Sequence, residues 1–140
     1  MTDMQKFNVL LASIAALALT TWPAVAHHSF AVFDLTKQVT IKGVIKEVQW
    51  TNPHVWVYLD VPRAEGGAPV QWGIEFTSVN HLTRLGMTRN TLKMGDTLEF
   101  TVNPYADGTP GGRFQHVKMP DGTYLCDVSA QQFCAQNNKK

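Results

Sequence analysis

A strict alternation of apolar and polar residues runs from His54 to Val61, and it constrains the fold more than any other feature of this sequence. Successive side chains of a β-strand point to opposite faces, so a period of two predicts a strand with one buried face. We expect the buried face to carry Val55, Val57, Leu59 and Val61, and the polar face to carry His54, Trp56, Tyr58 and Asp60.

Strand patterns recur on both sides of this segment. β-Branched residues alternate over 39–50, where Gly43 suggests a bulge, and shorter patterns cover 70–76, 97–102, 113–119 and 123–126. Ser78 and Gly86 suit the start and end of a short helix, and Asn103 to Gly112 is expected to be a loop.

This order of elements predicts a mainly β protein: a small five- to six-stranded, partly open, OB-like barrel with one short helix between strands three and four. A β-sandwich is the alternative, but it would need more strands than the pattern provides.

The first 26 residues resemble a secretory signal peptide. A short polar stretch with Lys6 precedes the apolar run from Phe7 to Trp22, and Ala24 and Ala26 are small residues where signal peptidase would cut. A retained membrane anchor is the alternative, but the run is short of the ~20 apolar residues of a typical span and lacks a positive flank. We therefore expect a periplasmic or secreted chain with no membrane attachment after cleavage.

Four parts are expected: a signal peptide (1–26), an N-terminal arm (27–38), a β-barrel domain (39–126) and a C-terminal tail (127–140). The signal segment would remove Asp3 and Lys6 together, so the net charge stays at +1. A nearly neutral domain is a poor candidate for nucleic-acid binding or for an anionic membrane surface.

Cys126 and Cys134 are the two cysteines of the chain. A disulfide is expected in an oxidising compartment. A redox pair or soft-metal ligands are the alternatives, but the spacing is neither Cys-x-x-Cys nor a zinc pattern. The polar residues from Ala135 to Lys140 are expected to fray.

Cleavage after Ala26 would create a mature N-terminus at His27-His28. An N-terminal histidine can offer its α-amine and its Nδ1 to one ion, and a second imidazole completes the three-nitrogen arrangement called a histidine brace. Such ligands in a tetragonal arrangement favour Cu(II). His28 offers a further ligand. The alternative is a flexible, solvated chain end.

The second imidazole is expected to come from His54. If Val61 pairs with Val70, Trp56 lies opposite Glu75 and His54 lies on the diagonal, within reach of long side chains. Glu75 is then either an acceptor that orients His54 or a direct ligand. The alternative is a surface histidine beside a surface carboxylate.

Trp56 and Tyr58 share the polar face of the same strand. We expect them to be exposed and to form a ligand or partner surface, or to be covered by Phe30 and Phe33 of the N-terminal arm. His81 and His116 are isolated and are expected to be structural or surface residues.

Several short motifs along the chain form a recognisable set. They are Ala26-His27-His28-Ser29-Phe30, Lys42-Gly43, Trp50-Thr51-Asn52-Pro53-His54-Val55-Trp56, Leu92 with Gly95-Asp96, and Asp121-Gly122. With them the sequence resembles domain-of-unknown-function family 6152, a family of small exported bacterial proteins. The resemblance covers about residues 26 to 125, so it does not extend to the cysteine pair. It implies a small periplasmic β-protein and assigns no activity.

Two classes of function remain. The first is a small periplasmic metal-binding protein, for copper, that uses His27, His54 and either His28 or Glu75. The second is a periplasmic interaction or ligand-binding module without a metal, in which Trp56 and Tyr58 bind an unknown protein or small ligand. The sequence does not favour an enzyme, because it contains no nucleophile elbow, phosphate-binding loop or paired-carboxylate motif.

Overall fold

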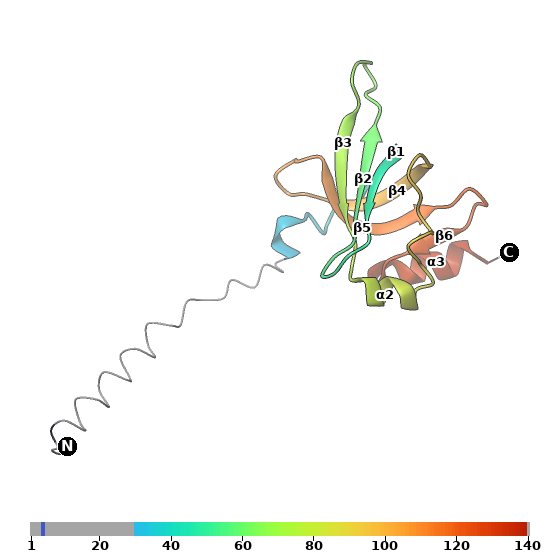
Figure 1. The fold of residues 1–140 in the computed structure, drawn as a ribbon. Coiled ribbons are helices and arrows are strands. Elements are labelled where there is room, and N and C mark those ends of the chain that lie inside the picture. Colours follow the sequence, from blue (N-terminus) through green and yellow to red (C-terminus); the bar gives the residue numbers. More distant parts are fainter. Residues whose placement is uncertain (1–3, 5–29, 140) are drawn as a thin grey trace.

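The computed structural model describes residue 4 and residues 30–139 (Figure 1). Within residues 30–139, six strands form one sheet, and four short helices accompany them. The strands are β1 (Val39–Gln49), β2 (Trp56–Val61), β3 (Val70–Glu75), β4 (Thr97–Pro104), β5 (Gly111–Lys118) and β6 (Tyr124–Cys126), and the helices are η1 (Phe30–Val32), α2 (Val79–Arg84), η2 (Val128–Ala130) and α3 (Gln131–Asn137).

The sheet closes on itself as a barrel. Its strand order is β3-β2-β1-β4-β5-β6, and a parallel pairing between β3 and β5 joins the two sides. β6 lies outside this closed five-stranded ring as an extra strand on β5. With α2 between β3 and β4, the structure confirms the prediction of a mainly β, OB-like barrel with one short helix at that place.

Two glycines allow the closure. A Cβ at Gly111 would lie 2.4 Å from the carbonyl oxygen of Gly73, and a Cβ at Gly112 would lie 2.2 Å from that of Asn103. The sequence analysis placed both glycines in a loop, which is wrong, because they are the first two residues of β5. Their lack of side chains lets β5 approach both neighbours and closes a barrel that the sequence pattern left partly open.

The alternating segment forms β2 from Trp56 onward, and its predicted apolar face is confirmed except at Val61, which is only partly buried. Val55, Val57 and Leu59 are fully buried in the barrel core, where they lie among residues such as Phe100 and Phe114. The backbone ladder extends beyond the start of β2 and the end of β3, because Phe76 N donates to Val55 O at 2.8 Å and Val55 N donates to Thr77 O at 3.3 Å.

The short helix α2 begins and ends as its sequence indicates. The Ser78 side chain caps its first turn by accepting from His81 N, and Gly86 follows it with a φ of 84°. Asn52 Oδ1 accepts from Val79 N at 3.2 Å, which ties the turn before β2 to the start of this helix. The second contact holds the turn that precedes His54.

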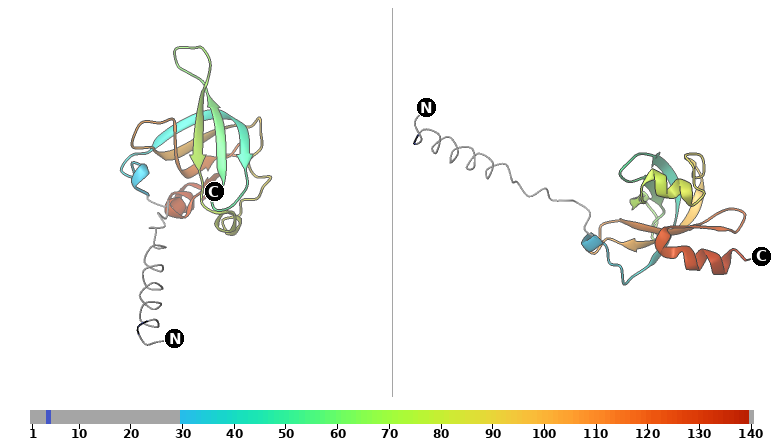
Figure 2. Two further views of the ribbon diagram at one scale, coloured as in Figure 1. Left: turned by 60° about the vertical axis from the view of Figure 1, so that its left-hand side comes forward. Right: turned by 90° about the horizontal axis from the view of Figure 1, so that it is seen from below.

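A disulfide joins Cys126 of β6 to Cys134 of α3, as predicted. Residues 127–139 form η2 and α3, which lies against β6 (Figure 2). Asn138 closes this region, since its side chain accepts from Tyr124 N and donates to Tyr124 O, both at 2.8 Å. The prediction that the chain frays from Ala135 onward is therefore wrong for the described residues up to Asn138.

His116 belongs to an aromatic cluster beside the disulfide. Its ring stacks on Phe133 with centroids 4.0 Å apart and meets Tyr124 edge-on at 5.6 Å. Burial lowers the pKa of His116 below its ordinary value. His81 Nδ1 lies 3.2 Å from Thr77 Oγ1 at the start of α2. Both histidines thus have local structural partners.

Among the residues that the structure describes, none of the helices has the length and apolar character needed to cross a bilayer. Apart from residue 4, the expected signal peptide (1–26) lies outside the described residues.

Candidate functional site

His54 and Glu75 meet at one end of the barrel. Val61 pairs with Val70 and Trp56 with Glu75, so the predicted register is confirmed. His54 Nδ1 lies 3.2 Å from Glu75 Oε1 and 3.0 Å from the carbonyl oxygen of Phe76. Their side chains are 27% and 23% exposed, so the pair is half-buried and still open to solvent.

These two contacts indicate which nitrogen of His54 carries the proton. A carbonyl and a carboxylate oxygen both accept, so the shared partner Nδ1 carries the proton and donates to them. The lone pair of the neutral imidazole then belongs to Nε2. Metal-binding histidines are commonly oriented in this way by a carboxylate or a backbone carbonyl. The geometry therefore favours Glu75 as the orienting acceptor over Glu75 as a direct ligand.

The pair opens into a small cavity of about 90 Å³, lined by Phe33, His54, Glu75, Phe76, Thr77 and Arg113. Arg113 reaches it because β5 runs parallel to β3 there and Arg113 is the register partner of Glu75. Its Nη2 donates to Asp127 Oδ2 at 2.8 Å. Arg113, the cationic register partner of Glu75, is thus bound to the carboxylate of Asp127.

The N-terminal arm is attached beside this cavity. Phe33 forms a β-bridge with Tyr105, and their rings stack with centroids 5.0 Å apart. Asp34 N donates to Pro104 O at 2.8 Å, and Ala106 N donates to Val32 O at 2.9 Å. These bonds hold the arm against the end of β4 (Figure 1).

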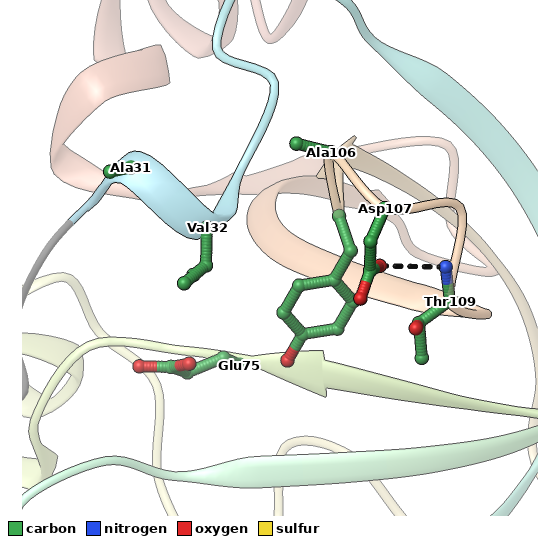
Figure 3. Close-up of a pocket in the computed structure, with 7 residues that line it drawn as sticks. Ala31, Val32, Glu75, Ala106, Asp107 and Thr109 are labelled. Atoms are coloured by element: carbon green, nitrogen blue, oxygen red, sulfur yellow. Dashed lines mark hydrogen bonds between the residues drawn. The ribbon is translucent and has the colours of Figure 1, made fainter.

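A wider groove of about 500 Å³ lies between the arm and the barrel. In Figure 3, Val32 approaches it from the arm, Glu75 lies on the opposite side, and Asp107 and Thr109 border it. Glu75 lines both this groove and the small cavity. The arm, the groove and His54 are therefore parts of one continuous region.

Tyr105 also lines the groove, and the sequence analysis missed it. Burial raises the pKa of its phenol, with further contributions from the negative charges of Glu75, ionised Tyr58 and Asp107. A backbone hydrogen bond from Thr109 lowers the pKa of the Asp107 carboxyl. The sequence contains one signal that points towards Tyr105. The alternation of polar and apolar residues in β4 continues to Pro104, beyond the predicted strand end at Val102.

Trp56 and Tyr58 are less exposed than predicted. Both are half-buried, and their rings stack with centroids 6.2 Å apart. They lie over Gly73, where a Cβ would meet the two rings at 3.5–3.7 Å, an ordinary van der Waals contact. Phe33, which was expected to cover them, stacks on Tyr105.

His27, His28 and the side chain of Phe30 lie outside the part of the chain that the structure describes. Within the described part, no group of three or more His, Cys, Asp or Glu side chains is arranged to hold a metal ion.

The family model described as a family of unknown function (DUF6152) matches residues 14–114. The chain belongs to this family. The match confirms the resemblance seen in the short motifs, and it spans the DUF6152 chain from within the expected signal peptide to β5. Its range includes His27, His54, Glu75 and Arg113, whereas Asp127 and the disulfide of this DUF6152 protein lie beyond it. Neither a curated protein nor a solved structure matches the chain.

Proposed function

We propose that this protein is exported by cleavage after Ala26 and that it binds a copper ion where His54 and Glu75 meet. The observation that carries the proposal is the double contact of His54 Nδ1 with Glu75 Oε1 and Phe76 O. With Nδ1 as the donor, the lone pair of the ring lies on Nε2, and metal-binding histidines are commonly oriented by a carboxylate or a backbone carbonyl in this way.

The remaining ligands are assigned to the new N-terminus. The α-amine and Nδ1 of His27 would chelate the ion, and His54 Nε2 would complete a three-nitrogen brace, with His28 as a further ligand. A free α-amine has a pKa near 8, so Cu(II) displaces its proton readily. Amine and imidazole nitrogens are also the donors that Cu(II) binds well.

The position of the arm supports this assignment. Phe33 lines the small cavity with His54, and Ala31 and Val32 line the groove with Glu75. The chain from His27 to Ala31 spans at most about 14 Å when fully extended. Attachment of the arm beside the cavity that His54 lines supports a reach of His27 to His54.

The function proposed is copper binding for storage or delivery in the periplasm. A half-buried site next to an open groove suits an ion that must be taken up and released. The disulfide and the family match are compatible with an exported protein, although neither assigns a compartment.

The test is a copper titration of the processed protein, which begins at His27. His54→Ala should weaken Cu(II) binding by at least about 100-fold, because it removes a ligand. His81→Ala is the matched control, since His81 is an exposed histidine on α2, and it should bind as the parent protein does. Equal binding by the two variants would refute the proposed site.

The second candidate function is a module that binds a small ligand without a metal, and the groove favours it. A volume of about 500 Å³ lies within the range of small-molecule sites, and Val32 and Tyr105 give it an apolar and aromatic lining. Under this alternative, copper binding would be weak whether the chain begins at His27 or carries one alanine before it. Tyr105→Ala would abolish ligand binding by the metal-free protein.

A further inference from the structure

Arg113 is in a position to disturb the proposed site. It is the parallel register partner of Glu75, and it lines the small cavity together with Glu75 and His54. A guanidinium forms charge-assisted bonds with a carboxylate, which are stronger than the bond that a neutral imidazole makes. If Arg113 bound Glu75 directly, it would compete with His54 for this acceptor and place a positive charge beside a cation site.

Asp127 binds this guanidinium instead. Arg113 Nη2 lies 2.8 Å from Asp127 Oδ2, and Asp127 is only 3% exposed. The same oxygen accepts from Ser129 Oγ at 2.9 Å. A buried carboxylate needs such partners, because an unpaired charge in the protein interior is costly. The ion pair thus satisfies Asp127 and also fixes the direction of the Arg113 side chain.

The backbone holds Asp127 in place. It follows Cys126, which the disulfide ties to Cys134 of α3. Its amide donates to Gln115 O at 2.7 Å, and its side chain caps η2. The carboxylate is therefore attached to β5 and to the C-terminal helices at once, and it cannot follow Arg113 if the arginine moves towards Glu75.

We propose that Asp127 is a positioning residue for the copper site: by binding the Arg113 guanidinium, it reserves Glu75 for His54. The inference rests on the proposed function for its metal-binding consequence, but the arrangement of Arg113, Glu75 and His54 can be tested without any metal. Asp127 lies beyond the family match, which ends at residue 114. The ion pair of Arg113 and Asp127 thus joins a C-terminal segment of this chain to a site within the matched range.

The experiment uses the processed protein and Asp127→Asn. In a crystal structure of the metal-free variant, the Arg113 guanidinium should lie within hydrogen-bond distance of the Glu75 carboxylate. Its Cu(II) affinity should fall by about 10-fold, the lower end of the effect of losing an orienting partner. In the double variant Asp127→Asn/Arg113→Gln, the competing cation is gone, and most of the affinity should return.

Ser129→Ala is the matched control, because it removes one hydrogen bond from Asp127 and leaves both charges in place. It should lower the stability and leave the copper affinity unchanged. If D127N does not fold, Asp127→Glu takes its place, since it keeps the charge but moves the carboxylate by one methylene; a shift of Arg113 towards Glu75 is again expected.

Two results would overturn the proposal. The first is an unmoved Arg113 with unchanged copper affinity in the folded D127N variant. The second is a double variant as weak as D127N, which would mean that Asp127 acts only by stabilising the C-terminal segment. If the parent protein bound no copper, the proposed function would fail, while the metal-free structure would still decide whether Asp127 keeps Arg113 from Glu75.

Discussion

The imidazole of His54 and the carboxylate of Glu75 lie 3.2 Å apart, although they come from different strands. His54 lies just before β2, and Glu75 is the last residue of β3. The pairing of Trp56 with Glu75 produces this contact, because it brings His54 next to the end of the neighbouring strand. The carbonyl of Phe76 gives the same ring nitrogen a second acceptor. An imidazole held in this way has one defined donor nitrogen and one defined lone pair.

Glu75→Gln tests the charge of this pair. Glutamine keeps the shape and one acceptor oxygen, so the fold should be retained, but the negative charge that strengthens the imidazole as a ligand is lost. We expect Cu(II) affinity to fall by about 10- to 100-fold. The control is Glu65→Gln in the exposed loop between β2 and β3, which removes the same charge at a distance from the site. An equal loss in both variants would indicate a general charge effect.

Cys126→Ser with Cys134→Ser tests the disulfide. The sequence separation of the pair is 8, and the chain-entropy model gives about 2.5 kcal/mol for a loop of this size. Urea unfolding of the double variant should show a loss of free energy of this order, and the parent protein under reducing conditions should match it. A loss below about 0.5 kcal/mol would mean that the other contacts of α3 suffice to hold β6.

Gly111→Ala tests the closure of the barrel. The new methyl group would lie 2.4 Å from Gly73 O and 2.8 Å from the Tyr105 ring, so β3 and β5 would have to separate. We expect a loss of about 2 kcal/mol or more in the free energy of unfolding. Gly108→Ala is the control, because its φ of 81° is also positive but its surroundings are open. It should lose only about 1 kcal/mol from backbone strain. Similar losses in the two variants would contradict the steric argument.

The pH dependence of stability tests the environment of His116. Burial holds the pKa of this imidazole below its ordinary value, so the unfolded chain takes up the proton at a higher pH than the folded chain. The contribution of His116 to stability is therefore present at neutral pH and is lost as the pH falls below about 6.5. His116→Gln should flatten this part of the stability curve in chemical unfolding experiments. An unchanged slope would show that other groups dominate it.

Local patterns predicted much of this structure because they reflect local physics. The alternation around Val57 fixed a buried strand face, and Val61 and Val70, on either side of a single loop, were enough to give the register that joins His54 to Glu75. Ser78 and Gly86 marked the helix for the same reason, since caps depend on adjacent residues.

The features that the sequence did not predict depend on contacts between distant segments. Gly111 and Gly112 have the composition of a loop, and only their approach to Gly73 and Asn103 makes them part of a strand. The pair of Arg113 and Asp127 arises because β6 and η2 fold back along β5. Tyr105 likewise acquires its role only when the arm pairs with it at Phe33.

Cu(II) binding by two forms of the chain is the decisive measurement for the proposed copper site. One form begins at His27, and the other carries a single alanine before it, which turns the α-amine of His27 into an amide. We expect the first form to bind one equivalent of Cu(II) with the electron paramagnetic resonance spectrum of a nitrogen-rich tetragonal site. The added alanine should weaken binding by at least about 100-fold. Equal affinities and identical spectra for the two forms would contradict the proposed site.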